Sequence, residues 1–277
     1  MILIADSGST KTDWILINEK DYQIIKTIGY NPYHISTDEI ISSIEFELIA
    51  HIEKEKITKI YFYGAGCATD PKKLIIRNAL NHHFPSAEIE IEHDLLAAAR
   101  ALLGKKKGFA AILGTGTNTC LYDGYDIIEN KISLGYLLGD EGSGAHIGKE
   151  ILKAYCRDLM PLELKMDFEK EFDKNPEIIL SEIYSVALPN RYMASFCTFA
   201  GKHQNHKFIQ ELVKKCFTDF FENIVCFYPD YKEYTLNVIG SVAYIYKEML
   251  VEIAQNFDMK IGDIIKSPVE GLINYHN

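Results

Sequence analysis

The strongest constraint in this sequence is a hairpin pattern that occurs twice. Residues 2–5 form an apolar run typical of a buried strand, residues 6–12 form a polar turn with glycine, and residues 14–17 return to a strand pattern. Residues 109–113, 114–118 and 119–122 repeat this order of strand, turn and strand. At an offset of 108 residues, Gly8-Ser9-Thr10 falls on Gly116-Thr117-Asn118. The repeat predicts two lobes that arose by duplication.

The rest of the chain fits this division. In the first half we expect helices over residues 37–54 and 95–103 and from Asp70-Pro71, with strands over 59–63 and 88–93. A lysine-rich break at residues 104–108 predicts a loop between a lobe of residues 1–107 and a lobe of residues 108–277. The second lobe is predicted to be mostly helical, including residues 144–155 and 242–250, with a strand over 235–239. The last helix is free to pack back on the first lobe.

The amino-acid composition argues against a nucleic-acid-binding protein and against a membrane protein. The 277 residues include 47% hydrophobic and 25% charged residues, which is ordinary for a globular chain, and the net charge of −10 argues against nucleic acid as a partner. No stretch approaches the roughly 18 apolar residues of a membrane span, and the first residues lack a basic signal-peptide region. The six cysteines are scattered without a CxxC pair. We therefore expect a cytoplasmic protein that binds neither membrane nor nucleic acid.

The first turn is a candidate phosphate site. It ends in Lys-Thr like a P-loop, but a P-loop needs glycine before that lysine and a helix after it, and here a strand follows. We expect Gly8 to let the backbone approach a phosphate, with hydrogen bonds from Ser9, Thr10 and Lys11. Asp6 could hold Mg²⁺ directly or through water. The alternative is an ordinary turn stabilised by hydroxyl groups.

The second turn offers the same groups without a carboxylate of its own. Thr115, Gly116, Thr117 and Asn118 supply amides and hydroxyls that suit an anion. Two such turns facing each other could clamp a triphosphate, with one metal site between them.

These motifs resemble those of a known family. The turns at 6–13 and 114–118, the stretch Leu134-Gly135-Tyr136-Leu137-Leu138-Gly139-Asp140-Glu141-Gly142-Ser143-Gly144, and Val238-Ile239-Gly240-Ser241-Val242-Ala243 follow the order found in N-acetylglucosamine kinases. The chain looks like a member of the wider group that also contains the activator ATPases of 2-hydroxyacyl-CoA dehydratases and benzoyl-CoA reductase. The resemblance implies an α/β fold of two actin-like, ribonuclease H-like lobes, with ATP and substrate in the cleft between them.

The resemblance also implies roles for single residues. Asp94 would be the catalytic base and contact the sugar, although it could also cap the helix that follows. Asn31 would bind sugar hydroxyls, or simply begin a turn with Pro32. Gly135 and Asp140 would complete the sugar site, unless Asp140 is only a carboxylate at the start of a helix.

The adenosine side of the predicted site is less specific. Gly240 and Ser241 would form the adenosine-binding turn, with Ala200 on the opposite side, although a strand-to-helix junction can require glycine for its own reasons. His82, His83 and His93 are expected to be surface residues, because no partner stands at ligand spacing, and no structural metal is predicted.

Several functions are compatible with these motifs. The leading hypothesis is transfer of the ATP γ-phosphate, with Mg²⁺, to the 6-hydroxyl of N-acetylglucosamine or another small amino sugar. An activator ATPase would need cysteines gathered around an iron-sulfur cluster, and these six are dispersed. A non-catalytic sensor is disfavoured because Asp6 and Asp94 are both present, and a ROK-type kinase because its zinc-binding cysteine cluster is absent. The oligomeric state stays open, with a homodimer among the alternatives.

Overall fold

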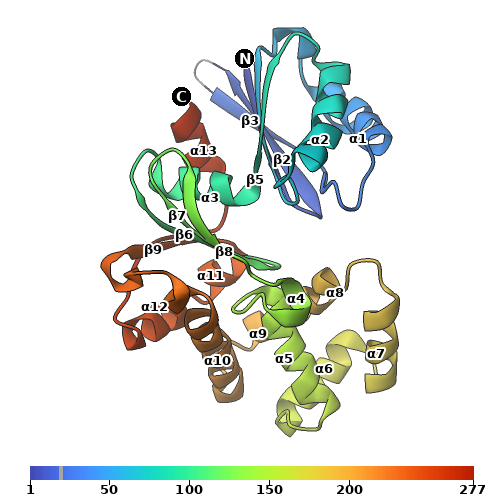
Figure 1. The fold of residues 1–277 in the computed structure, drawn as a ribbon. Coiled ribbons are helices and arrows are strands. Elements are labelled where there is room, and N and C mark those ends of the chain that lie inside the picture. The colour runs from blue at the N-terminus through green and yellow to red at the C-terminus, as the bar shows by residue number, and fades with distance from the viewer. Residues whose placement is uncertain (19–20) are drawn as a thin grey trace. The chain divides into compact units, whose positions relative to one another are not determined.

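The computed structural model describes residues 1–18 and 21–277. They form two compact units, one of Met1–Lys105 with Pro268–Asn277 and one of Lys106–Ser267 (Figure 1). The change of unit near residue 105 lies two residues before the boundary predicted from the sequence. The chain returns to the first unit for its last ten residues, where the sequence had allowed a helix to pack back.

The first unit is built on a five-stranded sheet in the order β3-β2-β1-β4-β5. Its strands are β1 (Ile2–Ser7), β2 (Lys11–Asn18), β3 (Asp21–Ile28), β4 (Lys59–Gly64) and β5 (Glu88–His93). The pairs β1–β2 and β2–β3 are antiparallel, whereas β1–β4 and β4–β5 are parallel. The central strand β1 therefore joins a hairpin to a parallel half of the sheet.

Helices cover both faces of this sheet. Leu3, Trp14 and Phe62 point to one face and pack with apolar residues of α1 (Thr37–Ser43) and α2 (Asp70–His83). Ile4 and Tyr63 point to the other face and pack against α3 (Asp94–Leu103) and α13 (Val269–His276). Because both faces are buried, β1 reads as a continuous apolar run rather than an alternating one.

The segment after α1 departs from the helix predicted over residues 37–54. It continues as a π-helical turn, η1 (Ile44–Leu48), and two short 3₁₀ helices, η2 (Ile49–His51) and η3 (Lys54–Lys56). The apolar spacing is satisfied by Ile44 and Leu48, which are fully buried, but the backbone changes its hydrogen-bonding period to keep them facing the sheet. The prediction of helical structure in this segment is correct, but the prediction of one regular helix is wrong.

The predicted surface position of the histidine pair is half wrong. His82 is exposed, but His83 at the end of α2 is buried. Its Nε2 lies 3.0 Å from the backbone oxygen of Ile41, so this histidine links α2 to α1.

The helices α3 and α13 approach each other closely. A methyl group on Gly271 would come within 2.3 Å of the backbone oxygen of Ala101, so glycine is required at this contact. Leu272 beside it is fully buried in the cluster that contains Ile4 and Ala97. This contact secures the C-terminal helix to the first unit.

We expect Gly271→Ala to destabilise the first unit by about 1–3 kcal/mol, because the added methyl group must push α13 away from α3. Urea unfolding followed by circular dichroism measures this change. Glu270→Ala is the matched control, since Glu270 is an exposed neighbour on the same helix. Equal stability of the two variants would contradict the close packing.

His276 adds a polar contact to the same helix. Its Nε2 lies 2.8 Å from Tyr63 Oη, and its ring stacks on Tyr61 with ring centroids 3.7 Å apart. The pKa of His276 is lowered from 6.5 to about 4, first by burial and then by the positive charges of Arg100 and Lys59.

This pKa shift predicts a loss of stability in acid. Between pH 6.5 and about 4 the unfolded chain binds a proton at His276 that the folded chain does not, so this residue's contribution is full at pH 7 and falls as the pH decreases through that window. We expect His276→Gln to flatten this part of the curve. Urea unfolding of both proteins at pH 7 and pH 4.5 measures the difference, and parallel losses would rule out the assignment.

The second unit has its own five-stranded sheet in the order β10-β9-β6-β7-β8. Its strands are β6 (Gly108–Leu113), β7 (Thr117–Tyr122), β8 (Ile127–Lys131), β9 (Thr235–Ile239) and β10 (Lys260–Ile265). Here β6–β7 and β7–β8 are antiparallel, and β6–β9 and β9–β10 are parallel. Reversed, this is the order of the first sheet, with β6 in the place of β1. The topology therefore supports duplication.

The same comparison corrects the predicted offset. The last pair of the first hairpin is Ser7 with Thr12, and that of the second is Leu113 with Thr117. The turn after Ser7 thus corresponds to the turn of residues 114–116, and the offset of 108 had misaligned them by two residues. Thr117 and Asn118, predicted to lie in the turn, belong to β7.

Most of the second unit is helical, as predicted. Its helices are α4 (Gly135–Leu138), α5 (Gly144–Cys156), α6 (Leu162–Phe172), α7 (Pro176–Ser185), α8 (Pro189–Ser195), α9 (Cys197–Lys202), α10 (Lys207–Asn223), α11 (Ser241–Ile245) and α12 (Lys247–Asn256), with short 3₁₀ turns η4 (Val225–Phe227) and η5 (Tyr231–Glu233). The helix predicted over residues 242–250 is two helices, α11 and α12, with a break at Tyr246. Within the described residues, no helix is both long enough and apolar enough to span a bilayer.

Candidate active site

The first unit gathers two predicted carboxylates at one edge of its sheet. Asp6 lies near the carboxyl end of β1, and Asp94 directly follows β5. The strands run parallel with β4 between them, and Ser7, Gly64 and His93 stand in register. Ligands of open α/β sheets bind at the carboxyl ends of such strands. The topology thus places Asp6 and Asp94 where a ligand would be expected.

The pKa of Asp6 reflects this neighbourhood. Burial raises it from 3.8 to about 7, and the negative charges of Asp94 and then Asp13 act in the same direction. Lys11 opposes the shift. A nearby cation would therefore stabilise the ionised form of Asp6.

Asp94 begins α3. Burial raises its pKa above 3.8, while His93 and the amides of Asp94 and Leu95 lower it. The helix starts at Asp94, and His93 occupies the N-cap position without a side-chain bond, but the Asp94 carboxylate still accepts from amides of the first helical turn. The Asp94 carboxylate is thus a stronger base than an exposed one.

The first turn is seated on Gly29. A methyl group there would lie 2.4 Å from the backbone oxygen of Gly8 and 2.5 Å from the Thr10 nitrogen. The turn itself is closed by a bond from the Gly8 amide to the Lys11 oxygen of 3.0 Å. Ser9 and Thr10 are exposed at its tip. Gly29 lies two residues before Asn31 in the sequence. Its contact with the first turn could not be predicted from the sequence, because the two segments are far apart along the chain.

Lys11 is held by a residue to which we assigned no function. Its Nζ lies 2.5 Å from Asp13 Oδ2, and Asp13 is buried. Within the described residues the other oxygen, Asp13 Oδ1, is buried without a hydrogen-bond partner. Since Asp13 pairs with Asp6 across the hairpin, two carboxylates and one lysine surround the turn.

Asn31 lies directly beside the first turn. Its Nδ2 donates to Ser9 Oγ at 2.7 Å, and its Oδ1 accepts from the Tyr33 amide at 3.1 Å. A methyl group on Gly66, which has a φ of +83°, would come within 2.5 Å of Asn31 Oδ1. The structure therefore brings together a predicted sugar-binding residue and a predicted phosphate-binding residue.

In the second unit, the corresponding turn contacts the start of α5. Gly144 donates to the Gly114 oxygen at 2.8 Å, and Ala145 donates to the Thr115 oxygen at 3.0 Å. Thr115 is exposed, but the hydroxyl of buried Thr117 donates to the Glu141 oxygen at 2.6 Å. Thr117 therefore has no hydroxyl proton left for a phosphate.

Asp140 supplies this turn with a carboxylate from outside the hairpin. It is buried, has a φ of +55°, and its Oδ1 accepts from the Thr117 amide at 3.2 Å. A methyl group on Gly116 would lie 3.0 Å from Asp140 Oδ2. Burial raises the pKa of Asp140, and the Thr117 amide and Ser133 hydroxyl lower it. The sequence of the second turn contains no carboxylate, but the fold brings the carboxylate of Asp140 next to it.

Two neighbours of Asp140 behave differently. Gly135 begins α4 with a φ of +65° and open space around it. His146, to which we assigned no function, is buried in α5, and its Nδ1 accepts from the Gly142 amide at 3.1 Å. His146 thus stabilises the loop that positions Asp140, and an isolated histidine gives no sequence signal for such a contact.

The remaining predicted residues of this unit have other partners. Asn118 Oδ1 accepts from Asn130 Nδ2 at 2.9 Å, within the sheet. Gly240 has a φ of +130°, and a methyl group there would lie 2.3 Å from the Leu113 oxygen and 3.1 Å from the Gly114 nitrogen. The turn at Gly240 and exposed Ser241 therefore adjoins the second phosphate turn, although packing alone already requires this glycine.

Ala200 is fully buried in the core of the second unit. The next residue, Gly201, lies near α11, since its added methyl group would meet Ile245 Cγ2 at 4.0 Å. This contact lies at the end of α11 away from Gly240, and the Ala200 side chain faces the core, so a position of Ala200 opposite the Gly240 turn stays a prediction.

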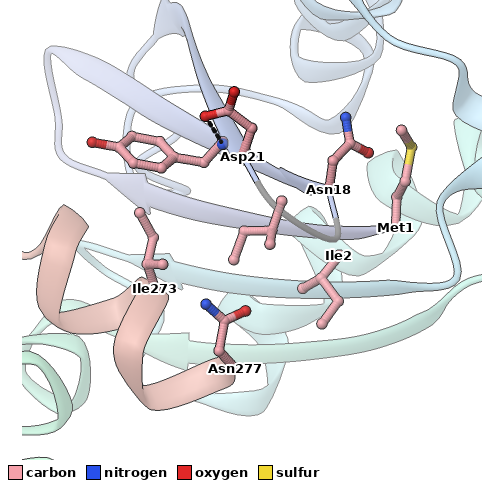
Figure 2. A pocket seen from close by; sticks show the side chains of 8 residues that line it. Met1, Ile2, Asn18, Asp21, Ile273 and Asn277 are labelled. Carbon is pink, nitrogen blue, oxygen red and sulfur yellow. Dashed lines mark hydrogen bonds between the residues drawn. The ribbon is translucent and has the colours of Figure 1, made fainter.

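A surface hollow lies at the other end of the first sheet. It has a volume of about 570 Å³ and is lined by residues at the start of β1, the end of β2 and α13, among them Ile2, Asn18 and Ile273 (Figure 2). The predicted site residues of the first unit do not line it. We therefore place the candidate active site at the carboxyl edge of the strands and not in this hollow.

Comparison with known proteins identifies the family. No family model matches the chain. The chain aligns along its whole length with the solved structure of a candidate N-acetylglucosamine kinase from Porphyromonas gingivalis, at 39% sequence identity and a TM-score of 0.95, covering 98% of that chain. The chain belongs to the N-acetylglucosamine kinase-like family. At the level of the family, the predicted class of ATP-dependent sugar phosphotransferase is confirmed.

Other matches are more distant. The N-acetylmuramic acid/N-acetylglucosamine kinase of Clostridium acetobutylicum is 25% identical over 205 residues, which are 69% of this chain and 66% of that relative. The match thus spans just under two thirds of the length of the curated relative. A candidate N-acetylglucosamine kinase from Chromobacterium violaceum, at 13% identity and a TM-score of 0.74, shares the fold, as does a ROK family glucokinase from Streptomyces griseus at 12% and 0.58. The predicted actin-like α/β fold is confirmed.

Substitutions of Gly8 and Gly29 can distinguish an effect on ligand binding from an effect on packing. A methyl group on Gly8 would meet no protein atom closer than 3.8 Å, whereas one on Gly29 would collide with the turn. We expect Gly8→Ala to keep the melting temperature and to weaken MgATP binding about tenfold or more, because the backbone must approach the phosphates.

Gly29→Ala should instead lose about 1–3 kcal/mol of stability. Thermal unfolding without nucleotide and calorimetric titration with MgATP measure the two effects. Full MgATP affinity in Gly8→Ala would remove the first turn from the nucleotide site.

Proposed function

We propose that this protein transfers the γ-phosphate of ATP to the 6-hydroxyl of an amino sugar, with N-acetylglucosamine as the leading acceptor. The observation that carries the proposal is the half-buried carboxylate of Asp94, which lies at the carboxyl edge of the parallel strands and interacts with Asp6. The family to which the chain belongs supports this reading.

Asp94 acts as the base. The sugar hydroxyl oxygen forms a bond to the γ-phosphorus, the bond from that phosphorus to the β,γ-bridging oxygen breaks, and ADP leaves. The hydroxyl proton passes to Asp94, whose raised pKa suits it to accept that proton late in the transfer. Most of the rate enhancement comes from positioning and charge stabilisation rather than from this proton transfer.

The turns supply amides for phosphate oxygens. Within the described residues, the amides of Ser9, Thr10, Thr115 and Gly116 have no hydrogen-bond acceptor. Unpaired amides at a sharp turn form an anion-binding concavity. Lys11 adds a positive charge beside the first turn, and Gly240 with Ser241 would bind adenosine next to the second.

The acidic groups of the first turn fit a magnesium ion. Asp6 has a pKa raised by burial and by two neighbouring carboxylates, and Asp13 Oδ1 has no partner within the described residues. Carboxylate oxygens are ligands that Mg²⁺ accepts, often through water. We propose that Asp6 holds Mg²⁺, which would neutralise phosphate charge when ATP is bound.

In each unit, residues beside the turn are proposed to contact the acceptor. Asn31 donates and accepts through one amide, so it can recognise neighbouring hydroxyl groups of a sugar. Asp140 accepts hydrogen bonds, and Gly135 leaves open space near it.

Two alternatives receive less support. An activator ATPase would need accessible thiolates for a cluster, but Cys67, Cys120, Cys197 and Cys216 are buried, and burial raises the pKa of each. A sensor would not need a base at Asp94 beside the proposed metal-binding carboxylate of Asp6. A cytoplasmic location fits an ATP-dependent enzyme with reduced thiols, and a homodimer remains a prediction.

We expect Asp94→Asn to reduce sugar-dependent ATP consumption by about 10²–10⁴-fold, because the amide cannot accept the hydroxyl proton. Glu92→Gln is the matched control: Glu92 lies two residues earlier and pairs with Lys73 at 2.7 Å. A coupled ATP-consumption assay with N-acetylglucosamine, glucosamine and N-acetylmuramic acid measures both variants.

Two outcomes would overturn parts of this proposal. If no sugar stimulates ATP consumption by the wild type, the kinase function is wrong. If a sugar does so and Asp94→Asn keeps full activity, another group is the base.

A further inference from the structure

Tyr33 is an exposed aromatic ring beside the proposed acceptor site. It is 60% exposed, and its amide donates to Asn31 Oδ1 at 3.1 Å. Gly66 packs under the ring, since a methyl group there would lie 3.0 Å from Tyr33 Cδ2. The ring thus belongs to the same loop cluster as Asn31.

Lys72, in the first turn of α2, covers one face of this ring. Its Nζ lies 4.1 Å from the ring centroid and donates to the Pro32 oxygen at 2.8 Å. Pro32 directly follows Asn31, so the ammonium group lies on the loop that carries the proposed sugar contact. The aromatic face and the carbonyl hold the cation in place.

Lys72 differs from the other lysines near this edge of the sheet. Lys11 is paired with Asp13, and Lys73 with Glu92. In the part of the chain that the structure describes, Lys72 has no carboxylate within ion-pair distance. An ammonium group has three donors, and the Pro32 oxygen uses one of them. Lys72 therefore has hydrogen-bonding capacity left for an anion.

The positive charge of Lys72 stands near acidic groups, and this bears on the charge of the acceptor. Asp6, Asp13 and Asp94 carry negative charge at this edge, and the whole chain has a net charge of −10. An acidic acceptor would be repelled here unless a fixed positive charge met it. A neutral sugar would need no such charge.

We propose that Lys72, held on the ring of Tyr33, binds the carboxylate of an acidic amino sugar, so that the acceptor class includes amino sugars with a carboxylate substituent. This inference rests on the proposed kinase function. Asn31 recognises the sugar hydroxyls, Lys72 the acidic substituent next to them, and Tyr33 keeps the ammonium group oriented and offers its ring to the sugar.

The test compares a neutral and an acidic acceptor that share one ring. N-Acetylglucosamine and N-acetylmuramic acid are assayed with the wild type, Lys72→Met, Tyr33→Phe and Tyr33→Ala, and calorimetry without ATP gives the Kd of each sugar. Methionine keeps most of the apolar stem of Lys72 and removes the charge. Lys73→Met is the matched control, because its side chain pairs with Glu92.

We expect Lys72→Met to lower the ratio of kcat/KM for the acidic sugar over the neutral sugar about tenfold, with a matching rise in the Kd of the acidic sugar. Tyr33→Phe should keep the wild-type ratio because the ring remains, and Tyr33→Ala should lower it. High salt should reduce the wild-type ratio more than that of Lys72→Met.

Two results would sink the inference without touching the kinase function: an unchanged ratio in Lys72→Met, or an equal loss for Lys73→Met. Phosphorylation of the neutral sugar with no binding of the acidic one by the wild type would have the same meaning. If neither sugar is phosphorylated, the proposed function fails, and the Kd of the acidic sugar in Lys72→Met still decides whether Lys72 binds the carboxylate.

Discussion

The half-buried carboxylates of Asp6 and Asp94 at the carboxyl edge of the first sheet are the constraint on which the candidate site depends. Parallel pairing of β1, β4 and β5 makes these strands end together, so Asp6 and Asp94 interact although 87 residues separate them. Like charges in a buried place are costly unless a proton or a cation compensates them. The raised pKa of Asp6 shows this cost, and Lys11 offsets it in part. Such an arrangement suits a protein that binds a cation with its substrate.

The turns owe their shape to contacts that are distant in sequence. Gly29 supports the first turn from below, and the start of α5 donates to the second through Gly144 and Ala145. Because these contacts fix the backbone of each turn, its amides can stay without a hydrogen-bond acceptor in the protein. The rigid support therefore explains how a few exposed residues, such as Ser9 and Thr115, can be presented to a ligand.

How far the sequence predicts this molecule depends on where each contact arises. Strands with largely buried apolar runs, such as β1, β4 and β9, were predicted within one or two residues because their apolar patterns are strong. The edge strand β5 was predicted from its alternation of isoleucine and glutamate. The edge strands β3, β8 and β10 were missed, because an edge strand with exposed polar residues has no clear period. Asp13 and His146 were missed for a different reason. Their partners, Lys11 and the Gly142 amide, become visible as contacts only once strand register and loop conformation are known.

Asp140 shows what the duplication changed between the two units. In the first hairpin the carboxylate lies on β1 itself, whereas in the second a loop with positive φ brings Asp140 back to the Thr117 amide. A methyl group on Gly116 would lie 3.0 Å from Asp140 Oδ2, so this carboxylate stands beside the turn and its negative charge disfavours a phosphate on the side that it faces. In the proposed site, phosphate would bind at the exposed side near Thr115, and sugar hydroxyl groups at the side of Asp140. A phosphate and a sugar bound to this one turn would lie close together, which is the arrangement that phosphoryl transfer requires.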